Sequence, residues 1–242
     1  MIYLTGDTHG KFSRIEEFCK KYNTTKDDIL IILGDAGINY NSAIADLIKK
    51  QFLHSLPITI FAIHGNHENR PTNIPTYKEK VWKEGIVYYE EDYTNILFSK
   101  DGEIYNFDGK KVIVIGGAYS VDKYQRLAYG YPWYYDEQPS DEIKDYVEKQ
   151  LDKLKWTIDI VLSHTAPICY EPKEAFLPGL DQSKVDKSTE MWLGSIEYKL
   201  NYNKWYCGHY HIEKKIDKIE FMFENYDILK EWFTPFFMQC LF

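Results

Sequence analysis

The stretch Ile29-Leu30-Ile31-Ile32-Leu33-Gly34-Asp35-Ala36-Gly37 joins an apolar run of strand length to a glycine and a carboxylate. Four further segments place a glycine or a polar cluster after an apolar run in the same way. They are Gly6-Asp7-Thr8-His9-Gly10, Gly65-Asn66-His67-Glu68, Ser163-His164-Thr165-Ala166 and Gly208-His209-Tyr210-His211. In open α/β sheets, ligands bind beyond the carboxyl ends of strands, so we expect the five loops to converge on one crevice.

Apolar runs and helical patterns alternate along the chain, which predicts a mixed α/β fold. Runs of β type occur at 1–4, 29–33, 58–63, 95–98, 112–115, 158–162, 204–207 and 219–223. The early β-α-β-α-β order favours parallel strands. In the middle of the chain, Asp101-Gly102 and Asp108-Gly109 are typical of hairpin turns and favour antiparallel strands.

Three helices are expected from periodicity and capping residues. In the first, Ser13 and Glu16 form a predicted capping box before an apolar stripe that includes Ile15 and Phe18. The others cover 42–52 and a segment opened by Ser140. The sequence has no internal repeat or linker, so residues 1–242 are expected to form a single domain.

The charge balance argues against broad binding of polyanions. The 242 residues include 29 Lys plus Arg and 37 Asp plus Glu, a net charge of -8. Proteins that bind nucleic acid or anionic lipid over a wide face usually carry a basic excess, so no broad basic nucleic-acid surface is expected. No apolar run approaches the length of a membrane span, and the first residues do not resemble a secretory signal. These patterns favour a cytoplasmic protein, in which the dispersed cysteines would be reduced.

The polar residues of the five loops match a metal site. Two Asp, one Asn and five of the seven histidines provide oxygen and imidazole nitrogen without thiolate, a donor set suited to Mn, Fe, Zn, Ni or Mg. A lone histidine is more often structural, and a lone Gly-Asp is more often a turn. Five such clusters after five strands favour metal binding. A Ser163-based hydrolase is disfavoured because no Gly-x-Ser-x-Gly surrounds that serine.

The order of these motifs resembles the calcineurin-like metallophosphoesterase family, and the resemblance runs from Asp7 to His211. It implies a four-layer α/β/β/α sandwich with two mixed sheets. It also implies two divalent or mixed-valence metal ions, with Mn favoured and Fe, Zn, Ni or Mg as alternatives. One ion would be held by Asp7, His9 and His211, the other by Asn66, His164 and His209, and Asp35 would bridge them.

By the same resemblance, His67 would be the general acid, and a hydroxide bridging the metals would attack phosphorus. The protein is thus expected to be a metal-dependent phosphoric ester hydrolase, with phosphomonoesters slightly favoured. The alternatives are a phosphodiesterase or nuclease acting on nucleotides or nucleic acid, and a non-catalytic interaction protein with the same fold. The complete ligand set favours an enzyme.

The chain departs from the family at one motif. Protein phosphatases of the family carry Gly-Asp-x-x-Asp-Arg-Gly, whereas Ile38 and Asn39 stand here at the second Asp and the Arg. That branch is therefore disfavoured, and Arg70 or Arg126 would have to supply a substitute phosphate contact. The alternative for each arginine is a surface ion pair.

Two aromatic or apolar segments are not explained by the metal motifs. Residues 119–139 hold a concentration of Tyr and Trp that could stack a planar substrate group, although ordinary loop packing or a subunit interface is favoured. The apolar tail at about 230–242 is expected to pack on its own domain or to form a homodimer contact.

Overall fold

The computed structural model describes residues 1–40 and 42–229, and its strands form two mixed sheets. The first sheet has the order β13-β1-β2-β3-β6-β5-β4. Strands β1, β2, β3 and β6 run parallel. At one edge β13 pairs antiparallel with β1, and at the other β5 pairs antiparallel with β6 and β4 pairs antiparallel with β5. The bounds are β1 Ile2–Thr5, β2 Ile29–Ile32, β3 Thr59–Ala62, β4 Lys78–Trp82, β5 Gly85–Tyr89, β6 Ile96–Ser99 and β13 Asp227–Ile228.

The second sheet has the order β11-β12-β10-β9-β8-β7. Its four central strands, β12, β10, β9 and β8, are parallel, and β11 and β7 are antiparallel edges. The bounds are β7 Ile104–Phe107, β8 Lys110–Ile115, β9 Thr157–Ser163, β10 Asn201–Cys207, β11 Lys214–Ile216 and β12 Ile219–Phe221.

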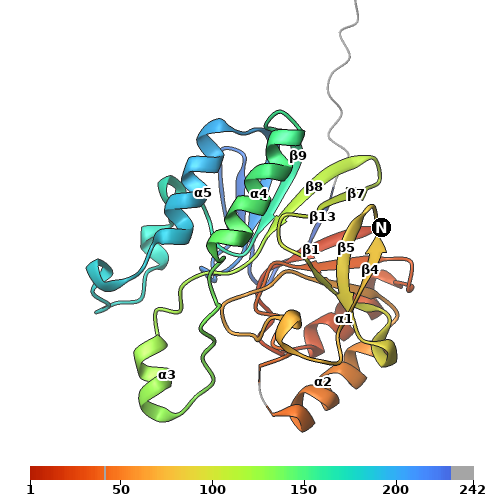
Figure 1. Cartoon of the computed structure of the whole chain (residues 1–242). Coiled ribbons are helices and arrows are strands. Elements are labelled where there is room, and N and C mark those ends of the chain that lie inside the picture. Colours follow the sequence, from red (N-terminus) through yellow and green to blue (C-terminus); the bar gives the residue numbers. More distant parts are fainter. Residues whose placement is uncertain (41, 230–242) are drawn as a thin grey trace, which may run out of the picture.

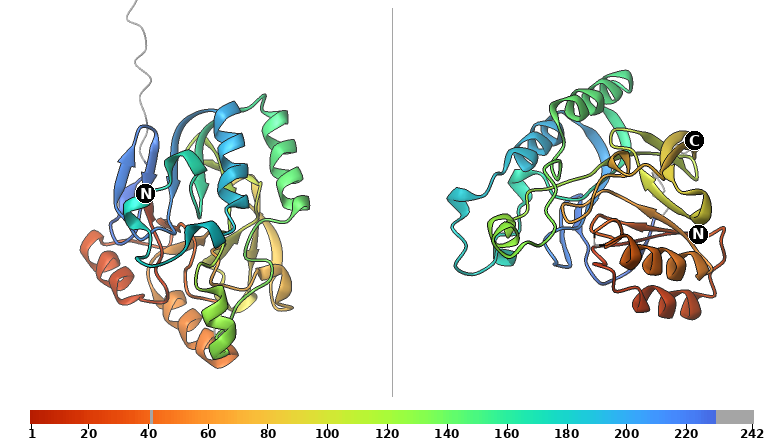
Figure 2. Two further views of the ribbon diagram at one scale, coloured as in Figure 1. Left: turned by 90° about the vertical axis from the view of Figure 1, so that its left-hand side faces the viewer. Right: turned by 60° about the horizontal axis from the view of Figure 1, so that its bottom comes forward.

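The sheets pack face to face, and helices cover both outer faces (Figures 1 and 2). Strand side chains alternate between faces, so Ile31 of β2 lies in the core between the sheets with Leu162 of β9, whereas Leu30 lies in the outer core. Helices α1 (Ser13–Tyr22) and α2 (Ala43–Ser55) cover the first sheet, and α4 (Asp141–Lys153) and α5 (Ser188–Lys199) cover the second. The expected α/β/β/α sandwich is therefore confirmed.

The helix starts follow the predicted caps in two cases and not in the third. The Ser42 and Ser140 side chains accept hydrogen bonds from the backbone N–H groups of Ala45 and Ile143. The predicted capping box of α1 is wrong, because the helix already begins at Ser13 and no side chain caps it. The preceding Phe12 is buried in the outer core, and its burial fixes the position at which the helix begins.

The two predicted hairpin turns have different outcomes. Asp108 and Gly109 connect β7 to β8 with φ of 51° and 82°, as a tight hairpin requires. Asp101-Gly102 does not form a hairpin, because the adjoining β6 and β7 belong to different sheets. The β4–β5 hairpin was not predicted: β4 is largely exposed and charged, and Lys83 and Glu84 occupy the positive-φ turn without a Gly or Asn.

The remaining elements are short or lie in the loops. Helix α3 (Lys123–Tyr129) projects from the sandwich (Figure 1). Short 3-10 helices span Pro71–Asn73, Glu91–Tyr93, Ile168–Tyr170, Lys173–Ala175 and Gln182–Lys184. In the described part of the chain no helix combines the length and apolarity needed to cross a membrane. The apolar tail at about 230–242, with its expected dimer contact, lies outside the described residues.

Candidate metal centre

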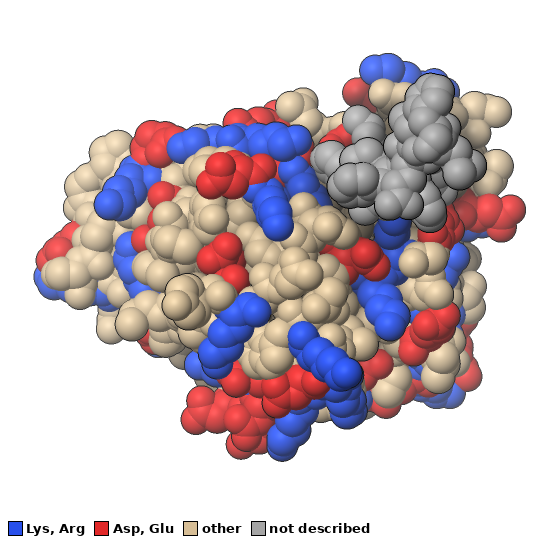
Figure 3. Space-filling model, turned by 90° about the horizontal axis from the view of Figure 1, so that it is seen from above, with Lys and Arg blue, Asp and Glu red and all other residues tan. Residues whose placement is uncertain are grey.

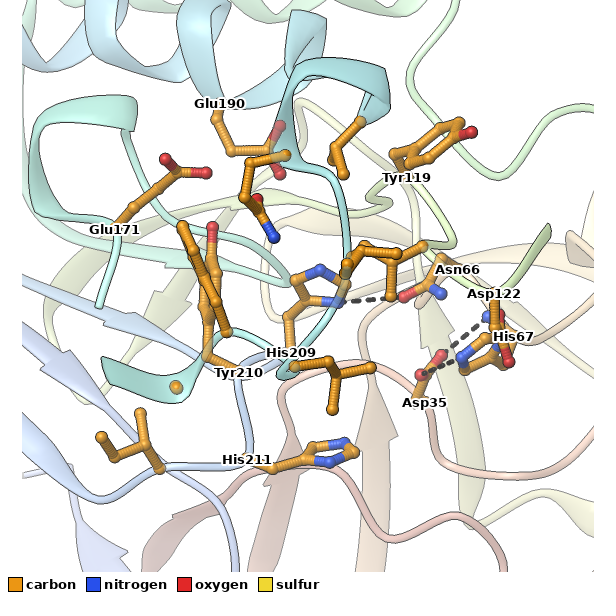
Figure 4. A pocket seen from close by; sticks show the side chains of 18 residues that line it. Asp35, Asn66, His67, Tyr119, Asp122, Glu171, Glu190, His209, Tyr210 and His211 are labelled. Atoms are coloured by element: carbon orange, nitrogen blue, oxygen red, sulfur yellow. Dashed lines mark hydrogen bonds and ion pairs between the residues drawn. The ribbon is translucent and has the colours of Figure 1, made fainter. Parts of the chain in front are cut away.

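The five loops meet where the two sheets adjoin. Asp7, Asp35 and Asn66 follow β1, β2 and β3 of the first sheet, and His164 and His209 follow β9 and β10 of the second. Parallel neighbouring strands place their carboxyl ends at the same edge, so residues far apart in sequence become neighbours. Figure 4 shows Asp35, Asn66, His67, His209 and His211 around one cavity.

One group of donor atoms consists of Asp7, His9 and His211. Their candidate ligand atoms all lie within 4.8 Å of one another. The Nε2 atoms of His9 and His211 are 2.9 Å apart, and Asp7 Oδ2 is 3.1 Å from His211 Nε2 and 3.6 Å from His9 Nε2. Two imidazoles and a carboxylate that aim at one point suit a divalent cation.

A second group is formed by Asn66, His164 and His209. Asn66 Oδ1 lies 2.8 Å from His164 Nε2 and 3.1 Å from His209 Nδ1. Ser120 accepts a hydrogen bond from Asn66 Nδ2, which directs the amide oxygen toward the histidines. The expected ligands of the second ion are thus adjacent.

The contacts of His164 test whether a cation fits this second group. His164 Nδ1 is 2.8 Å from the carbonyl oxygen of Leu33, which can only accept, so Nδ1 carries a proton. In neutral His164, Nε2 is then an acceptor that faces another acceptor, Asn66 Oδ1. A bound cation would satisfy both lone pairs, and the Leu33 contact is the kind that orients a metal-binding imidazole. The residues present therefore fit a metal ion.

Asp35 lies between the two groups. Its Oδ2 is 3.9 Å from His9 Nδ1 and 3.9 Å from His164 Nε2. Asp7, Asp35 and His164 also form a set whose ligand atoms lie within 4.8 Å. The Asp35 carboxylate is 2% exposed, so water does not compensate its charge. This position is suited to a carboxylate shared by two cations.

The protonation states of His9, His209 and Asp7 favour metal binding. Burial lowers the pKa of His9 and lowers that of His209 well below its usual range, so both imidazoles are neutral donors. Burial would raise the pKa of Asp7, but the hydrogen bond to His211 and the nearby His164 outweigh it. The pKa of Asp7 therefore lies below its ordinary value, and the carboxyl group is ionised.

The backbone around the site adopts conformations that are uncommon for side chains larger than glycine. His9, Asp35, His209 and His211 have φ between 46° and 66°. Such left-handed residues cluster at functional sites, where the surrounding structure maintains the strain. At Gly208 the constraint is contact: an added Cβ would lie 2.4 Å from Asp7 Oδ1 and 2.8 Å from the Leu33 carbonyl oxygen.

Gly208→Ala is therefore expected to displace Asp7 and to weaken metal binding by about 10- to 100-fold, the usual cost of disturbing groups that support metal ligands. Metal titration followed by calorimetry would measure the change. The matched control is Gly109→Ala at the β7–β8 turn, where an added Cβ meets nothing within 4 Å. The control should lose stability from its positive φ but should keep its metal affinity. Equal metal affinity in wild type and Gly208→Ala would contradict the prediction.

His67 lies beside the donor groups with Arg126 next to it. The His67 backbone N–H donates to Asp35 Oδ1 at 2.8 Å, and the ring Nε2 is 4.0 Å from Asp35 Oδ2. Arg126 Nη2 is 3.4 Å from His67 Nε2. Asp122 and the Tyr40 hydroxyl bind the same guanidinium. Arg126, His67 and Asp35 line a second cavity of about 370 Å³.

Arg70, the other predicted phosphate contact, has a different environment. Its Nη1 donates to Asp101 Oδ2 at 2.6 Å, and its Nε donates to the Asp136 carbonyl oxygen. The side chain lines a separate cavity with His64 and Tyr146. Asp101 also accepts from the Gly116 backbone N–H. The position of Arg70 therefore does not support the expected phosphate contact. Its charge is paired with Asp101, which lies in the connection from β6 to β7.

Most aromatic side chains of the segment 119–139 pack against neighbouring residues or are exposed to solvent. Trp133 Nε1 donates to Glu137, and the Tyr134 hydroxyl donates to the Asn39 and Tyr40 carbonyl oxygens. Tyr129 and Tyr131 are exposed. The ring of Tyr119, at the start of the segment, does line the main cavity beside the metal site (Figure 4).

Sequence reasoning missed several residues near the site. Ser120 and Asp122 follow the strand end at Gly116-Gly117 and lie within the segment 119–139, but neither was singled out. Glu190 lies in α5, a helix that was not predicted, and no motif marks it. Its proximity to His209 results from the packing of α5 on the second sheet.

Comparisons with known proteins agree with this geometry. The family model of calcineurin-like phosphoesterases matches residues 1–213. The fold is similar to that of TT1561 of Thermus thermophilus, at 13% identity and a TM-score of 0.51, covering 92% of this chain and 87% of that chain. It is also similar to the phosphopantetheinyl hydrolase PptH from Mycobacterium tuberculosis, at 15% identity and a TM-score of 0.50, with coverage of 92% and 87%. The curated proteins yield no match.

Proposed function

The chain belongs to the calcineurin-like phosphoesterase family and is a metal-dependent phosphoester hydrolase, and from this premise we propose that it hydrolyses phosphomonoesters at the centre around Asp35. The observation that carries the proposal is the position of Asp35 between two groups of metal-type donors. We assign one ion to Asp7, His9 and His211 and a second to Asn66, His164 and His209, with Asp35 shared. This set of carboxylate, amide and imidazole donors is compatible with manganese, the metal we propose.

Two bound divalent ions would supply Lewis acidity, which lowers the pKa of a water molecule and offsets negative charge on the phosphoryl oxygens. The side chains of the protein provide the rest. His67 would act as the general acid toward the leaving oxygen, and the Asp35 carboxylate orients its loop through the His67 backbone N–H. Arg126, held by Asp122 and Tyr40, would bind a non-bridging phosphate oxygen beside His67.

The charge distribution suits a small phosphate ester better than a long polyanion. On the face seen in Figure 3, Lys and Arg side chains are interspersed with Asp and Glu wherever the residues are described. At the centre itself, positive charge for the substrate would come from the metal ions and from Arg126, which lines the adjoining cavity. This supports a small ester with one phosphate group, which can lie wholly at the centre, over a nucleic acid with many.

Metal analysis combined with two chromogenic esters tests the proposed function. We expect about two metal ions per chain, the number used in two-metal sites, and faster turnover of 4-nitrophenyl phosphate than of bis(4-nitrophenyl) phosphate. Faster diester cleavage would overturn the monoester assignment. Bound metal without turnover of either ester would favour a non-catalytic interaction protein.

Arg126→Met is expected to raise KM for the monoester by about tenfold or more, because a hydrogen bond to a charged group contributes about 1.5–3 kcal/mol. Steady-state kinetics would measure KM and kcat separately. The KM of Arg126→Lys should lie between those of the wild type and Arg126→Met. Lys123→Met is the control, because Lys123 Nζ lies over the Trp133 ring at 4.1 Å and does not line the site. A KM that does not respond to Arg126→Met would remove Arg126 from the binding site.

A further inference from the structure

A cavity of about 460 Å³ opens beside the metal centre and is not accounted for by the phosphate chemistry. Asn66, His67 and His209 form the wall nearest the metals (Figure 4). The other walls come from the segment that follows β9, from the loop after β8 and from the residues after His209. Their apolar members are Tyr119, Val121, Phe176, Leu177, Leu180, Val185, Tyr210 and Ile212.

The apolar walls include two stacked aromatic rings. The rings of Phe176 and Tyr210 are nearly parallel, with an interplanar angle of 27° and centroids 6.5 Å apart. The Tyr210 ring also meets Phe221 edge to face, which fixes its orientation. Flat, largely apolar surfaces favour a planar group that buries its faces. The neighbouring cavity beside Arg126 lacks these aromatic walls.

The charged residues of the cavity are acidic. Asp122, Glu171 and Glu190 line it, and none of its described lining residues is Lys or Arg. Glu171 is paired with Lys187 at 2.8 Å. A second phosphate group or a nucleic-acid backbone in this cavity would face these carboxylates, and Lys187, which lies over the Phe176 ring, is already paired with Glu171.

Glu190, whose pKa burial raises to about 7, has a carboxyl oxygen in this cavity that is unpartnered among the described residues. It is 4% exposed, and its Oε1 accepts from the Thr165 hydroxyl at 2.7 Å. Its Oε2 is buried and has no hydrogen-bond partner in the described part of the chain. Figure 4 shows the carboxylate on the side of the cavity away from His67. A buried acceptor without a donor costs free energy that a suitable ligand would recover.

We infer that this cavity binds the alcohol part of the substrate, and that the substrate is the phosphate ester of a flat, largely apolar alcohol bearing an N–H donor. The phosphate would lie at the metal centre, the flat group against Phe176 and Tyr210, and the donor at Glu190. This inference rests on the proposed function, which it deepens by naming the substrate class.

Three aryl phosphates of similar leaving-group chemistry test the assignment: phenyl phosphate, 4-(aminomethyl)phenyl phosphate and 4-(carboxymethyl)phenyl phosphate. In the manganese-loaded protein, kcat/KM for the amine ester should exceed that for the carboxylate ester by at least about tenfold, the usual scale of a charged hydrogen bond. Glu190→Gln should bring this ratio close to one. Glu17→Gln, at an exposed position of α1, should not change it.

A second variant tests the flat wall. Phe176→Ala should raise KM for all three esters by about tenfold because apolar contact area is lost. The control is Tyr198→Ala, since Tyr198 is exposed on α5. Unchanged KM values in Phe176→Ala, or an amine-to-carboxylate ratio that Glu190→Gln leaves intact, would overturn the inference.

Direct binding separates this inference from the proposed function. By ligand-observed NMR, benzylamine should bind the protein, phenylacetate should not, and Glu190→Gln should lose the difference. If phenyl phosphate is hydrolysed but the two ligands bind equally, the inference fails and the proposed function stands. If benzylamine binds selectively but no ester is hydrolysed, the proposed function fails and the cavity assignment stands.

Discussion

Asp35→Asn is expected to lower both the metal content and the activity of the protein. The substitution keeps the shape of the side chain and can preserve the acceptor for the His67 backbone N–H. It removes the buried negative charge that lies 3.9 Å from both His9 and His164. Two divalent cations close together depend on a shared anionic group to offset their repulsion, so at least one ion should be lost.

The expected loss of activity follows from the loss of that ion. A catalytic metal stabilises the transition state by several kcal/mol, and about 1.4 kcal/mol is a factor of ten in rate, so kcat/KM should fall on the order of 1000-fold. Metal content per chain by mass spectrometry and turnover of phenyl phosphate would measure both effects. Asp145→Asn, at an exposed position of α4, is the matched control. Full metal content in Asp35→Asn would show that Asp35 is not a shared ligand.

His67→Ala is expected to reduce turnover by about 100- to 10,000-fold, the range of general acid–base catalysis, while metal content stays close to that of the wild type. The reason is that His67 lies beside the donor groups, and its ring Nε2 is next to Arg126 instead of among the ligand atoms. The loss should be greater for phenyl phosphate than for 4-nitrophenyl phosphate, because nitrophenolate departs readily without a proton.

His54→Ala is the control for this variant, since His54 lies in α2 and contacts Asn95 away from the site. An equal loss for both esters would indicate that His67 positions the substrate instead of donating a proton. Metal loss as large as in Asp35→Asn would place His67 among the ligands. The two variants together therefore separate metal binding from proton transfer.

The fold could be predicted largely from local patterns, because its central strands are buried on both faces. Runs such as 29–33 and 158–162 are apolar with little interruption, as strands between a second sheet and a helix layer must be. Exposed edge strands carry no such signal. In β4, Lys78 and Glu79 face solvent, and its pairing with β5 stabilises a segment whose composition resembles a loop.

The sequence by itself determined which residues are available for metal binding, because each candidate ligand follows closely on a strand and strand ends in such sheets share an edge. Tertiary structure decided what surrounds them. Arg126 approaches His67 because the segment after β8 carries α3 to this position, whereas Arg70 is paired with Asp101. Glu190 reaches the main cavity only through the packing of α5 on the second sheet. Local sequence encodes strands, turns and caps. Contacts between distant segments depend on how whole elements pack, and these contacts shape the main cavity.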